Sequence, residues 1–205
     1  MNFTTSQEYF WAGEFGDEYQ HRNVGEEIVS SNLRLFAEVL DKMPSDPQSV
    51  FEIGANIGLN LDALRMLLPH ASLEALEINE RAHNVLEEKG FVAKRGSILD
   101  FEMDQTYDLV LIKGVLIHIN PEKLPDVYGK MACLAAEWLL FAEYYNPDPI
   151  ELDYRGHEGR LFKRDFAGEF LDQNKDFELS AHGFRYRRSS LDRDDTNWFL
   201  MRKKV

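Results

Sequence analysis

Apolar side chains recur along this chain at two spacings, one typical of amphipathic helices and one typical of buried strands. One helical face consists of five apolar residues separated by steps of four and three: Val29, Leu33, Phe36, Leu40 and Met43. This face predicts a helix of about 18 residues that ends near Pro44, because proline and the turn residues after it stop a helix. Leu61, Leu64 and Leu68 mark the inner face of another helix, which Pro69 ends.

Short apolar runs between the helical segments predict buried strands. They occupy residues 49–53, 73–78, 91–95, 107–112 and 137–145. Helical segments at 81–90 and 120–135 alternate with them, which predicts a parallel sheet with helices on both faces. Residues 177–188 and 195–204 predict two more strands, and their short connection indicates an antiparallel pair. We therefore expect an α/β fold with a mostly parallel seven-stranded sheet and an antiparallel C-terminal strand.

Length and composition indicate one folded domain. The chain has 205 residues, of which 44% are hydrophobic, enough to bury a sizeable core. We interpret 1–205 as a single domain with an N-terminal lid and helix (1–45), a cofactor-binding core (46–145) and a substrate-facing segment with C-terminal strands (146–205). No run reaches the roughly 18 consecutive apolar residues of a membrane span, and no secretory signal pattern opens the chain. With Cys133 as the single cysteine, these features predict a cytoplasmic protein without disulfides.

Charge is distributed unevenly along the chain, whose formal net charge is −13. Residues 151–205 carry 12 basic and 11 acidic side chains, so the first 150 residues carry the negative excess. Such a field repels a polyphosphate backbone, which argues against a nucleic-acid partner. The basic residues of the last quarter form two clusters: Arg155, Arg160, Lys163 and Arg164, then Arg185, Arg187 and Arg188. These clusters indicate either a local anion site or a solvated surface.

The turn after the first predicted strand carries candidate chemistry, because open parallel sheets bind ligands at the carboxyl ends of their strands. Its sequence, FEIGANIG, matches the dinucleotide pattern GxGxxG only at Gly54, since Asn56 and Leu59 replace the other glycines. The pattern acidic-x-Gly-x-Gly-x-Gly of S-adenosylmethionine-dependent methyltransferases fits better, with Glu52 as the acidic residue and Gly58 as the last glycine. Asn56 replaces the middle glycine, and asparagine tolerates a left-handed backbone.

S-adenosylmethionine as the ligand would give a role to residues at the ends of several strands. Backbone amides after the glycine turn can receive its carboxylate, and Glu52 can take its amino group directly or through water. Glu77 lies 19 residues after Gly58, where a carboxylate can accept both ribose hydroxyls, and Ser97 and Ile98 can hold adenine. The predicted cofactor-binding residues are Trp11, Tyr19, Arg22, Glu52, Gly54, Asn56, Gly58, Asn60, Glu77, Ile78, Ser97, Ile98, Lys113 and Gly114. The sequence predicts no metal site.

Segments over nearly the whole chain resemble one family of such enzymes, the pseudaminic acid biosynthesis-associated methyltransferases. The segments are EYFWAGEFGDEYQHRN (8–23), FEIGANIGLNL (51–61), ALEIN (75–79), YDLVLIKGVLIHINPEKL (107–124) and EYYNPDPIELDYRGHEGRLFKRDF (143–166). The resemblance implies the Rossmann-like class I methyltransferase fold with S-adenosyl-L-methionine as cofactor. It also implies a small-molecule acceptor, a nonulosonic acid of bacterial surface or flagellar glycans such as pseudaminic acid, or its nucleotide-activated form. Asn56 departs from the general glycine pattern.

An acceptor of this kind carries a carboxylate and, when activated, a phosphate. Three arginines offer forked donors for such groups: Arg155, Arg160 and Arg164. A surface balanced by neighbouring acids is the alternative. Methyl transfer to a sugar hydroxyl benefits from a general base, and we favour His157 in the segment DYRGHEGR over the other candidates, His118 and Glu143. For His118, a structural anchor before the proline-started helix is the better interpretation.

The N-terminal segment predicts a lid over the cofactor, to which Trp11 and Tyr19 belong and from which Arg22 meets the cofactor carboxylate. A packing arm is the alternative for this segment. The same cofactor turns would serve N-methylation or carboxyl methylation of another small molecule, and they would also suit a non-catalytic cofactor-binding protein. The sequence leaves open the acceptor atom, the sugar and the oligomeric state.

Overall fold

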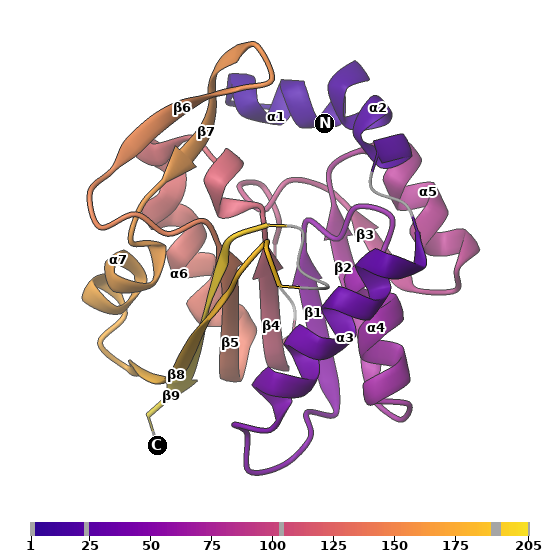
Figure 1. Cartoon of the computed structure of the whole chain (residues 1–205), viewed down its shortest axis with the longest axis vertical. Helices are drawn as coiled ribbons and strands as arrows, with labels where there is room; N and C mark the ends of the chain where they lie inside the picture. Colours follow the sequence, from indigo (N-terminus) through magenta and orange to yellow (C-terminus); the bar gives the residue numbers. More distant parts are fainter. Residues whose placement is uncertain (1–2, 23–24, 103–104, 190–193, 205) are drawn as a thin grey trace.

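Seven strands form one sheet through the middle of the molecule, within residues 3–22, 25–102, 105–189 and 194–204, which the computed structural model describes (Figure 1). The strands are β1 (Ser49–Ile53), β2 (Ser72–Glu77), β3 (Val92–Arg95), β4 (Tyr107–Lys113), β5 (Ala135–Glu143), β8 (Phe177–Arg185) and β9 (Thr196–Lys203). Their order is β3-β2-β1-β4-β5-β9-β8. The pairs from β3 to β5 are parallel, and β9 runs antiparallel to both β5 and β8. The sheet predicted from the sequence is confirmed.

The strand order reverses beside β1. The chain moves outward from β1 to β2 and β3, then returns to place β4 on the other side of β1. Ligands of such sheets bind in the crevice at the carboxyl ends of the strands, next to this reversal. Here β1 ends at Ile53 and β4 ends at Lys113, so the candidate site is expected between the turns that follow them.

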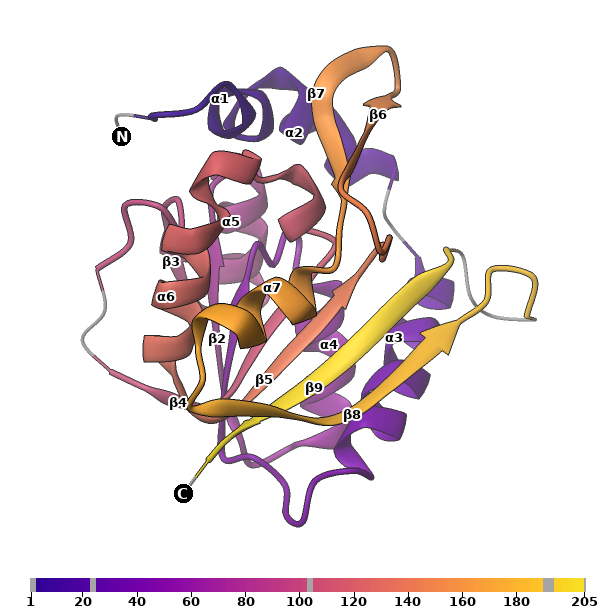
Figure 2. The ribbon, with the colours of Figure 1, turned by 90° about the vertical axis from the view of Figure 1, so that its left-hand side faces the viewer.

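Helices cover both faces of the sheet (Figure 1, Figure 2). One face carries α3 (Glu26–Leu40), α4 (Leu59–Leu67) and α5 (Glu80–Glu88), and the other carries α6 (Leu124–Leu134) and α7 (Phe166–Gln173). Along β4, Leu109 and Leu111 join the core under α3, whereas Val110 and Ile112 join the core under α6. Burial on both faces explains why the strands read as continuous apolar runs. Within the described ranges no helix is long and apolar enough to cross a membrane.

Two further pairs of elements lie beyond the carboxyl ends of the central strands (Figure 1, Figure 2). They are α1 (Ser6–Ala12) with α2 (Glu14–Arg22), and the antiparallel hairpin of β6 (Ile150–Tyr154) and β7 (His157–Lys163). The elements predicted from the sequence include neither the hairpin nor α7. β6 does alternate apolar and polar residues, although it is mostly exposed in the structure, and α7 has only 8 residues. The helix predicted at 120–135 is shorter in the structure, since the 3-10 turn η2 (Pro121–Lys123) replaces its first turn before α6. Another 3-10 turn, η1 (Leu116–His118), lies just before the predicted helix.

Candidate functional site

The turn between β1 and α4 follows a left-handed backbone. Gly54, Asn56 and Gly58 have φ angles of 72°, 49° and 78°. A Cβ atom at position 54 would lie 2.6 Å from Cγ2 of Val115, so this position requires both the left-handed φ and the absence of a side chain. Asn56 adopts the left-handed conformation expected of it, which asparagine tolerates better than most residues. After this turn the first N–H groups of α4 have no partner within the helix.

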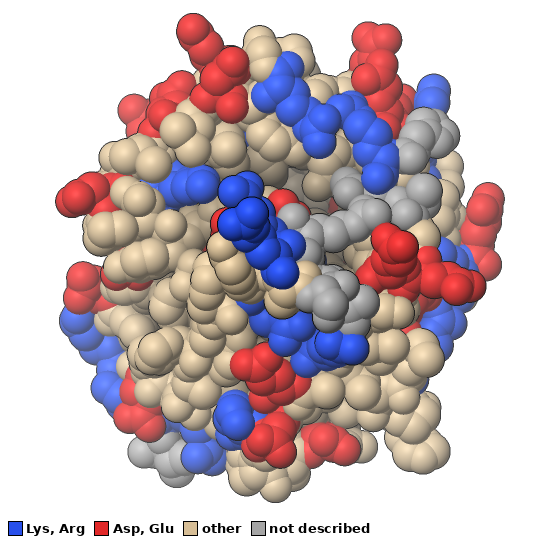
Figure 3. Space-filling view, in the orientation of Figure 1, with Lys and Arg blue, Asp and Glu red and all other residues tan. Residues whose placement is uncertain are grey.

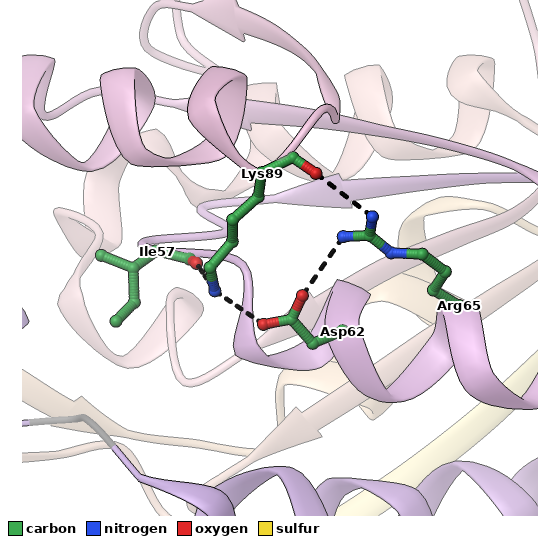
Figure 4. A network of polar contacts seen from close by, with 4 residues as sticks. All are labelled: Ile57, Asp62, Arg65 and Lys89. Carbon is green, nitrogen blue, oxygen red and sulfur yellow. Dashed lines mark hydrogen bonds and ion pairs between the residues drawn. The ribbon is translucent and has the colours of Figure 1, made fainter.

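A network of polar contacts holds this turn against the end of α5 (Figure 4). Lys89 Nζ donates to the carbonyl oxygen of Ile57 and to Oδ2 of Asp62, each at 2.6 Å. Arg65 donates to Asp62 and to the carbonyl oxygen of Lys89, each at 3.2 Å. Because Ile57 belongs to the turn and Lys89 follows α5, the network fixes the turn relative to the neighbouring helix.

Glu77, the last residue of β2, directs its carboxylate toward the same turn. Its Oε2 accepts a hydrogen bond from the backbone N–H of Asn56 at 2.6 Å, and its Oε1 accepts one from that of Asn79 at 2.8 Å. Glu77 is 6% exposed, and this burial raises its pKa in spite of the two hydrogen bonds. A carboxylate has about four lone-pair sites, so each oxygen can accept one more donor, such as a hydroxyl group.

Two cavities meet above the carboxyl ends of β1, β2 and β4. The larger has a volume of about 260 Å³ and the smaller about 90 Å³. They share five lining residues and so form one crevice: Trp11, Gly54, Ile78, Val115 and His118. The larger part is also lined by the predicted residues Tyr19, Asn56, Asn60, Glu77, Lys113 and Gly114, and the smaller part by Ser97 and Ile98. Figure 3 shows this face hollowed, with Lys and Arg side chains around the hollow.

Glu52 and Gly58 do not line the crevice. Glu52 is fully buried, and its Oε1 accepts a hydrogen bond from Nδ2 of Asn60 at 2.5 Å. Burial raises the pKa of Glu52 to about 7, against the opposing effect of the Asn60 hydrogen bond. Glu52 is expected to take the amino group directly or through water, and in this arrangement it is linked to the crevice through Asn60, which lines it. A Cβ atom at Gly58 would lie 2.7 Å from Leu86, so this glycine serves the packing of α4 on α5.

The helices α1 and α2, which we call the lid, lie over the crevice. Trp11 of α1 and Tyr19 of α2 line it. Arg22 does not: its Nη2 pairs with Glu18 at 3.4 Å, and its guanidinium lies 5.1 Å from the ring centroid of Phe15. The expected contact between Arg22 and a cofactor carboxylate is therefore not available in this arrangement.

The β6–β7 hairpin holds the lid in place. Nε2 of Gln7 donates to the carbonyl oxygen of Gly159 at 3.0 Å, and Nη1 of Arg160 donates to Oγ of Ser6 at 3.1 Å. The ring centroid of Phe10 also lies 5.0 Å from the Arg160 guanidinium. These contacts join residues more than 140 positions apart in the sequence, so the hairpin determines where α1 lies over the crevice.

His118 lies in η1, where the two parts of the crevice meet. Its Nδ1 is 2.5 Å from the carbonyl oxygen of Arg160. Because a carbonyl oxygen only accepts hydrogen bonds, Nδ1 carries the proton, and Nε2 of the neutral ring keeps its lone pair. Burial lowers the pKa of His118 to about 4, against the opposing effect of the Arg160 hydrogen bond. The rings of Trp11 and Tyr154, with centroids 4.5 Å and 4.8 Å away, fix the imidazole further.

We expect His118 to stay neutral in the folded protein until the pH falls to about 4. Nitrogen NMR on histidine-labelled protein should show a ring protonated at Nδ1 alone, assigned by its loss in His118→Gln. The unfolded chain binds this proton near its ordinary pKa of about 6.5, so the contribution of His118 to stability is lost as the pH falls from there. A ring protonated at Nε2, or one that titrates at the ordinary value while folded, would contradict the assigned hydrogen bond.

The other two candidate bases are not placed for that role. His157 begins β7 on the exposed surface, where its ring centroid lies 4.9 Å from that of Phe10, and it does not line the crevice. Oε1 of Glu143 accepts hydrogen bonds from the backbone N–H groups of Val115 and Leu116, both at 2.9 Å. Burial raises the pKa of Glu143 to about 7. Glu143 thus holds the turn after β4, and the structure corrects the preference for His157 as the base.

The three arginines expected to bind the acceptor do not line the crevice either. Arg164 pairs with Glu169 at 2.8 Å, with both side chains largely buried. Arg160 is engaged with Ser6 of the lid. Arg155 is exposed at the hairpin turn, where its φ is 55°. Because each arginine has a different environment, their clustering in the sequence does not produce one anion site.

Some crevice residues are not singled out from the sequence, among them Asn32 of α3, Asp194 and Thr196. Arg185, which belongs to the second basic cluster of the sequence, lines the same part and pairs with Glu38 at 2.9 Å. The buried residues of α3 are Asn32, Leu35, Phe36 and Val39, a face shifted from the predicted one. Asn32 is three, four and seven residues before Leu35, Phe36 and Val39, a spacing that places it on the same helical face. A polar side chain on a buried face is uncommon, so this spacing could have marked Asn32 as a candidate site residue.

Comparisons with known proteins find similarity at the level of the fold. No family model and no curated protein sequence matches the chain. The magnesium protoporphyrin IX methyltransferase from Synechocystis, solved with bound S-adenosylmethionine, is 14% identical with a TM-score of 0.72 over 100% of both chains. The 1,6-didemethyltoxoflavin-N1-methyltransferase from Burkholderia thailandensis, solved with S-adenosylhomocysteine, is 13% identical with a TM-score of 0.72, covering 100% of this chain and 93% of its own.

A glycopeptide N-methyltransferase is 14% identical with a TM-score of 0.63, over 84% of this chain and 89% of its own. The acceptors named for these three proteins are a porphyrin, a heterocycle and a glycopeptide. The chain therefore has the Rossmann-like fold of class I S-adenosylmethionine-dependent methyltransferases, a fold that serves acceptors of very different chemistry.

Proposed function

We propose that this protein is an S-adenosylmethionine-dependent methyltransferase whose cofactor binds in the crevice above β1, β2 and β4. One observation carries the proposal. Along a single crevice, the left-handed turn at Gly54, the buried carboxylate of Glu77 and the pocket at Ser97 and Ile98 follow one another. These features match, in order, an amino-acid moiety, a ribose and a flat apolar base.

The residues present fit this cofactor. Both oxygens of Glu77 can still accept ribose hydroxyls after their bonds to backbone amides. The smaller part of the crevice is mainly apolar and carries Ile78 and Ile98, which suits adenine. At the other end, the free N–H groups at the start of α4 suit a carboxylate. The lid residues Trp11 and Tyr19 line the crevice, where they could cover a bound cofactor.

The chemistry expected of the site is an in-line displacement, in which positioning supplies much of the rate. S-adenosylmethionine, when bound, supplies a methyl group on a sulfonium sulfur. For a hydroxyl acceptor, we assign proton acceptance to Nε2 of His118, whose tautomer the Arg160 carbonyl oxygen sets. Its low pKa keeps the ring unprotonated at neutral pH but makes it a weak base, so the proton should leave the acceptor together with methyl transfer.

For the acceptor we propose a small anionic sugar, a nonulosonic acid such as pseudaminic acid or its nucleotide-activated form, methylated on oxygen during glycan biosynthesis. The support is the resemblance of the segments at 8–23 and 143–166 to the pseudaminic acid biosynthesis-associated methyltransferases. Arg155, Arg160 and Arg164 do not support it, since they lie outside the crevice. The cationic side chains that line the crevice are Lys113 and Arg185 within the described part of the chain.

Methyl-labelled cofactor and an extract rich in nucleotide sugars test this function. We expect a labelled product in an anionic sugar fraction, and its stability in base would identify an ether rather than a carboxyl ester. A base-labile product would indicate carboxyl methylation, and label on an amine would indicate N-methylation. Cofactor binding without transfer to any component of the extract would favour a non-catalytic cofactor-binding protein. His118→Gln should lower transfer without lowering cofactor affinity, because His118 acts on the acceptor proton.

A further inference from the structure

Lys113 presents an ammonium group to the larger part of the crevice without a bonded partner. It is the last residue of β4, is mostly buried and lines the crevice. Within the described part of the chain, its Nζ makes no hydrogen bond and no ion pair. Burial lowers the pKa of Lys113, although nearby acids oppose this effect. The Nζ atom is not fully buried, because Lys113 lines the crevice, so a ligand there that accepts hydrogen bonds can reach it.

The acids around Lys113 do not satisfy it. The charges that act on it are those of Glu52, Glu143 and Asp194. Oε1 of Glu52 is bonded to Asn60, and Oε1 of Glu143 is bonded to two backbone amides. Asp194 is hydrogen-bonded to the side chain of Tyr144. The other donors of Glu52 and Glu143 occupy Oε1 alone, and Oε2 of each is buried without a hydrogen-bond partner within the described part of the chain. Because Lys113 forms no ion pair with any of the three acids there, its donor hydrogens remain available to a molecule in the crevice.

We propose that Lys113 is the cationic centre of a carboxylate-binding subsite in the larger part of the crevice. Thr196 and Asn32 line the same part and add neutral donors beside the ammonium group. Other charged residues line it as well: Glu77, Asp194, which is bonded to Tyr144, and Arg185. Arg185 is committed to Glu38 at 2.9 Å, so the described residues of the subsite offer no free arginine fork of the kind that phosphate prefers. One ammonium with neutral donors suits a group of one negative charge. This inference rests on the proposed function, because it concerns a ligand of the same crevice.

A carboxylate could reach Lys113 from two sources, the amino-acid part of the cofactor or the acceptor. NMR of protein labelled at the lysine ε-carbons can measure the pKa of the Lys113 side chain. The Lys113 resonance is the one that is missing from the spectrum of the Lys113→Arg variant. The pKa would be measured in the free protein, with methylthioadenosine, with S-adenosylhomocysteine, and with acetate added to the free protein and to each complex. Methylthioadenosine keeps the adenosine but lacks the carboxylate. Lys42, at the end of α3 and paired with Asp41, is the internal control whose resonance should not respond.

Carboxylate binding should raise the pKa of Lys113, because a nearby negative charge favours the ammonium form. A rise with S-adenosylhomocysteine but not with methylthioadenosine would assign the subsite to the cofactor. A rise that appears only when acetate is added to the S-adenosylhomocysteine complex would assign it to the acceptor. If the subsite belongs to the cofactor, Lys113→Met should weaken the binding of S-adenosylhomocysteine by about tenfold or more and leave the binding of methylthioadenosine unchanged.

No rise under any of these conditions, acetate included, would overturn the subsite. That result differs from failure of the proposed function. If the proposed function is wrong, neither methylthioadenosine nor S-adenosylhomocysteine binds, but acetate still raises the pKa of Lys113. Thermal unfolding of Lys113→Met and Lys113→Arg, compared with the surface variant Lys42→Met, separates loss of binding from loss of fold.

Discussion

Replacing Glu77 with alanine is expected to reduce the affinity for S-adenosylhomocysteine by about 2 to 4 kcal/mol, since two charge-assisted hydrogen bonds to the ribose are lost. The carboxylate is 6% exposed and lines the crevice, so no other acid in the described part of β2 can replace it. The affinity for methylthioadenosine should fall by the same factor, because this compound keeps the ribose. The loss of affinity for both compounds distinguishes Glu77 from Lys113. If Lys113 contacts the cofactor, its replacement would weaken the binding of S-adenosylhomocysteine alone, because methylthioadenosine has no carboxylate.

Calorimetry measures both affinities, and two further variants control the comparison. Glu77→Gln keeps the shape and one acceptor oxygen, so its loss should be smaller. Glu88→Ala removes an exposed carboxylate from the end of α5 and should change neither affinity. Because Glu77 also accepts the N–H groups of Asn56 and Asn79, thermal unfolding must show that the alanine variant remains folded. Unchanged affinity in a folded Glu77→Ala protein would rule out the ribose role.

Gly54→Ala is expected to remove most cofactor binding and to destabilise the fold. A left-handed backbone costs an L-residue about 1 to 2 kcal/mol, and the added methyl group would lie 2.6 Å from Val115 in the wall of the crevice. Crowding of this kind typically costs a further 1 to 3 kcal/mol, roughly, and displaces the turn after β4. We expect affinity for S-adenosylhomocysteine to fall by at least about tenfold, the factor that corresponds to 1.4 kcal/mol.

Gly90→Ala is the matched control for this variant. Gly90 has a φ of 79°, but no atom lies within 4 Å of the Cβ that alanine would add, and it follows α5 outside the crevice. It should therefore show the cost of the left-handed backbone alone, with cofactor affinity unchanged. Equal effects of the two substitutions on affinity, measured by calorimetry beside thermal unfolding, would show that close approach at Gly54 plays no part in binding.

The sequence predicts the sheet and the cofactor side of the crevice because the determinants there are local. Apolar runs mark each core strand, and the residues Gly54, Glu77 and Ser97 lie at or just after the carboxyl ends of strands. Parallel strands bring their carboxyl ends to one edge of the sheet, so residues at strand ends meet even when they are distant in sequence. The left-handed conformation of Asn56 is likewise predictable from its residue type and its place in the turn.

The acceptor side could not be predicted because its geometry depends on contacts between distant segments. β6 alternates apolar and polar residues but is mostly exposed, and nothing in that pattern shows that the hairpin positions α1 and orients His118 through the Arg160 carbonyl oxygen. A backbone carbonyl leaves no mark in the sequence. Arg155 and Arg164 are close in the chain, but the hairpin separates their environments. Similarly, His157 has the chemistry of a base and lies on the outer surface.

The central claim is that the crevice binds S-adenosylmethionine, and calorimetric titration of the protein with S-adenosylhomocysteine and with NAD tests it most directly. Both ligands contain adenosine, but the turn at Gly54 and Asn56 lacks the glycine pattern that receives a pyrophosphate. We predict saturable binding of one S-adenosylhomocysteine per chain, with NAD much weaker and the Glu77→Ala variant impaired. Tighter binding of NAD, or no binding of S-adenosylhomocysteine by the folded protein, would contradict the account.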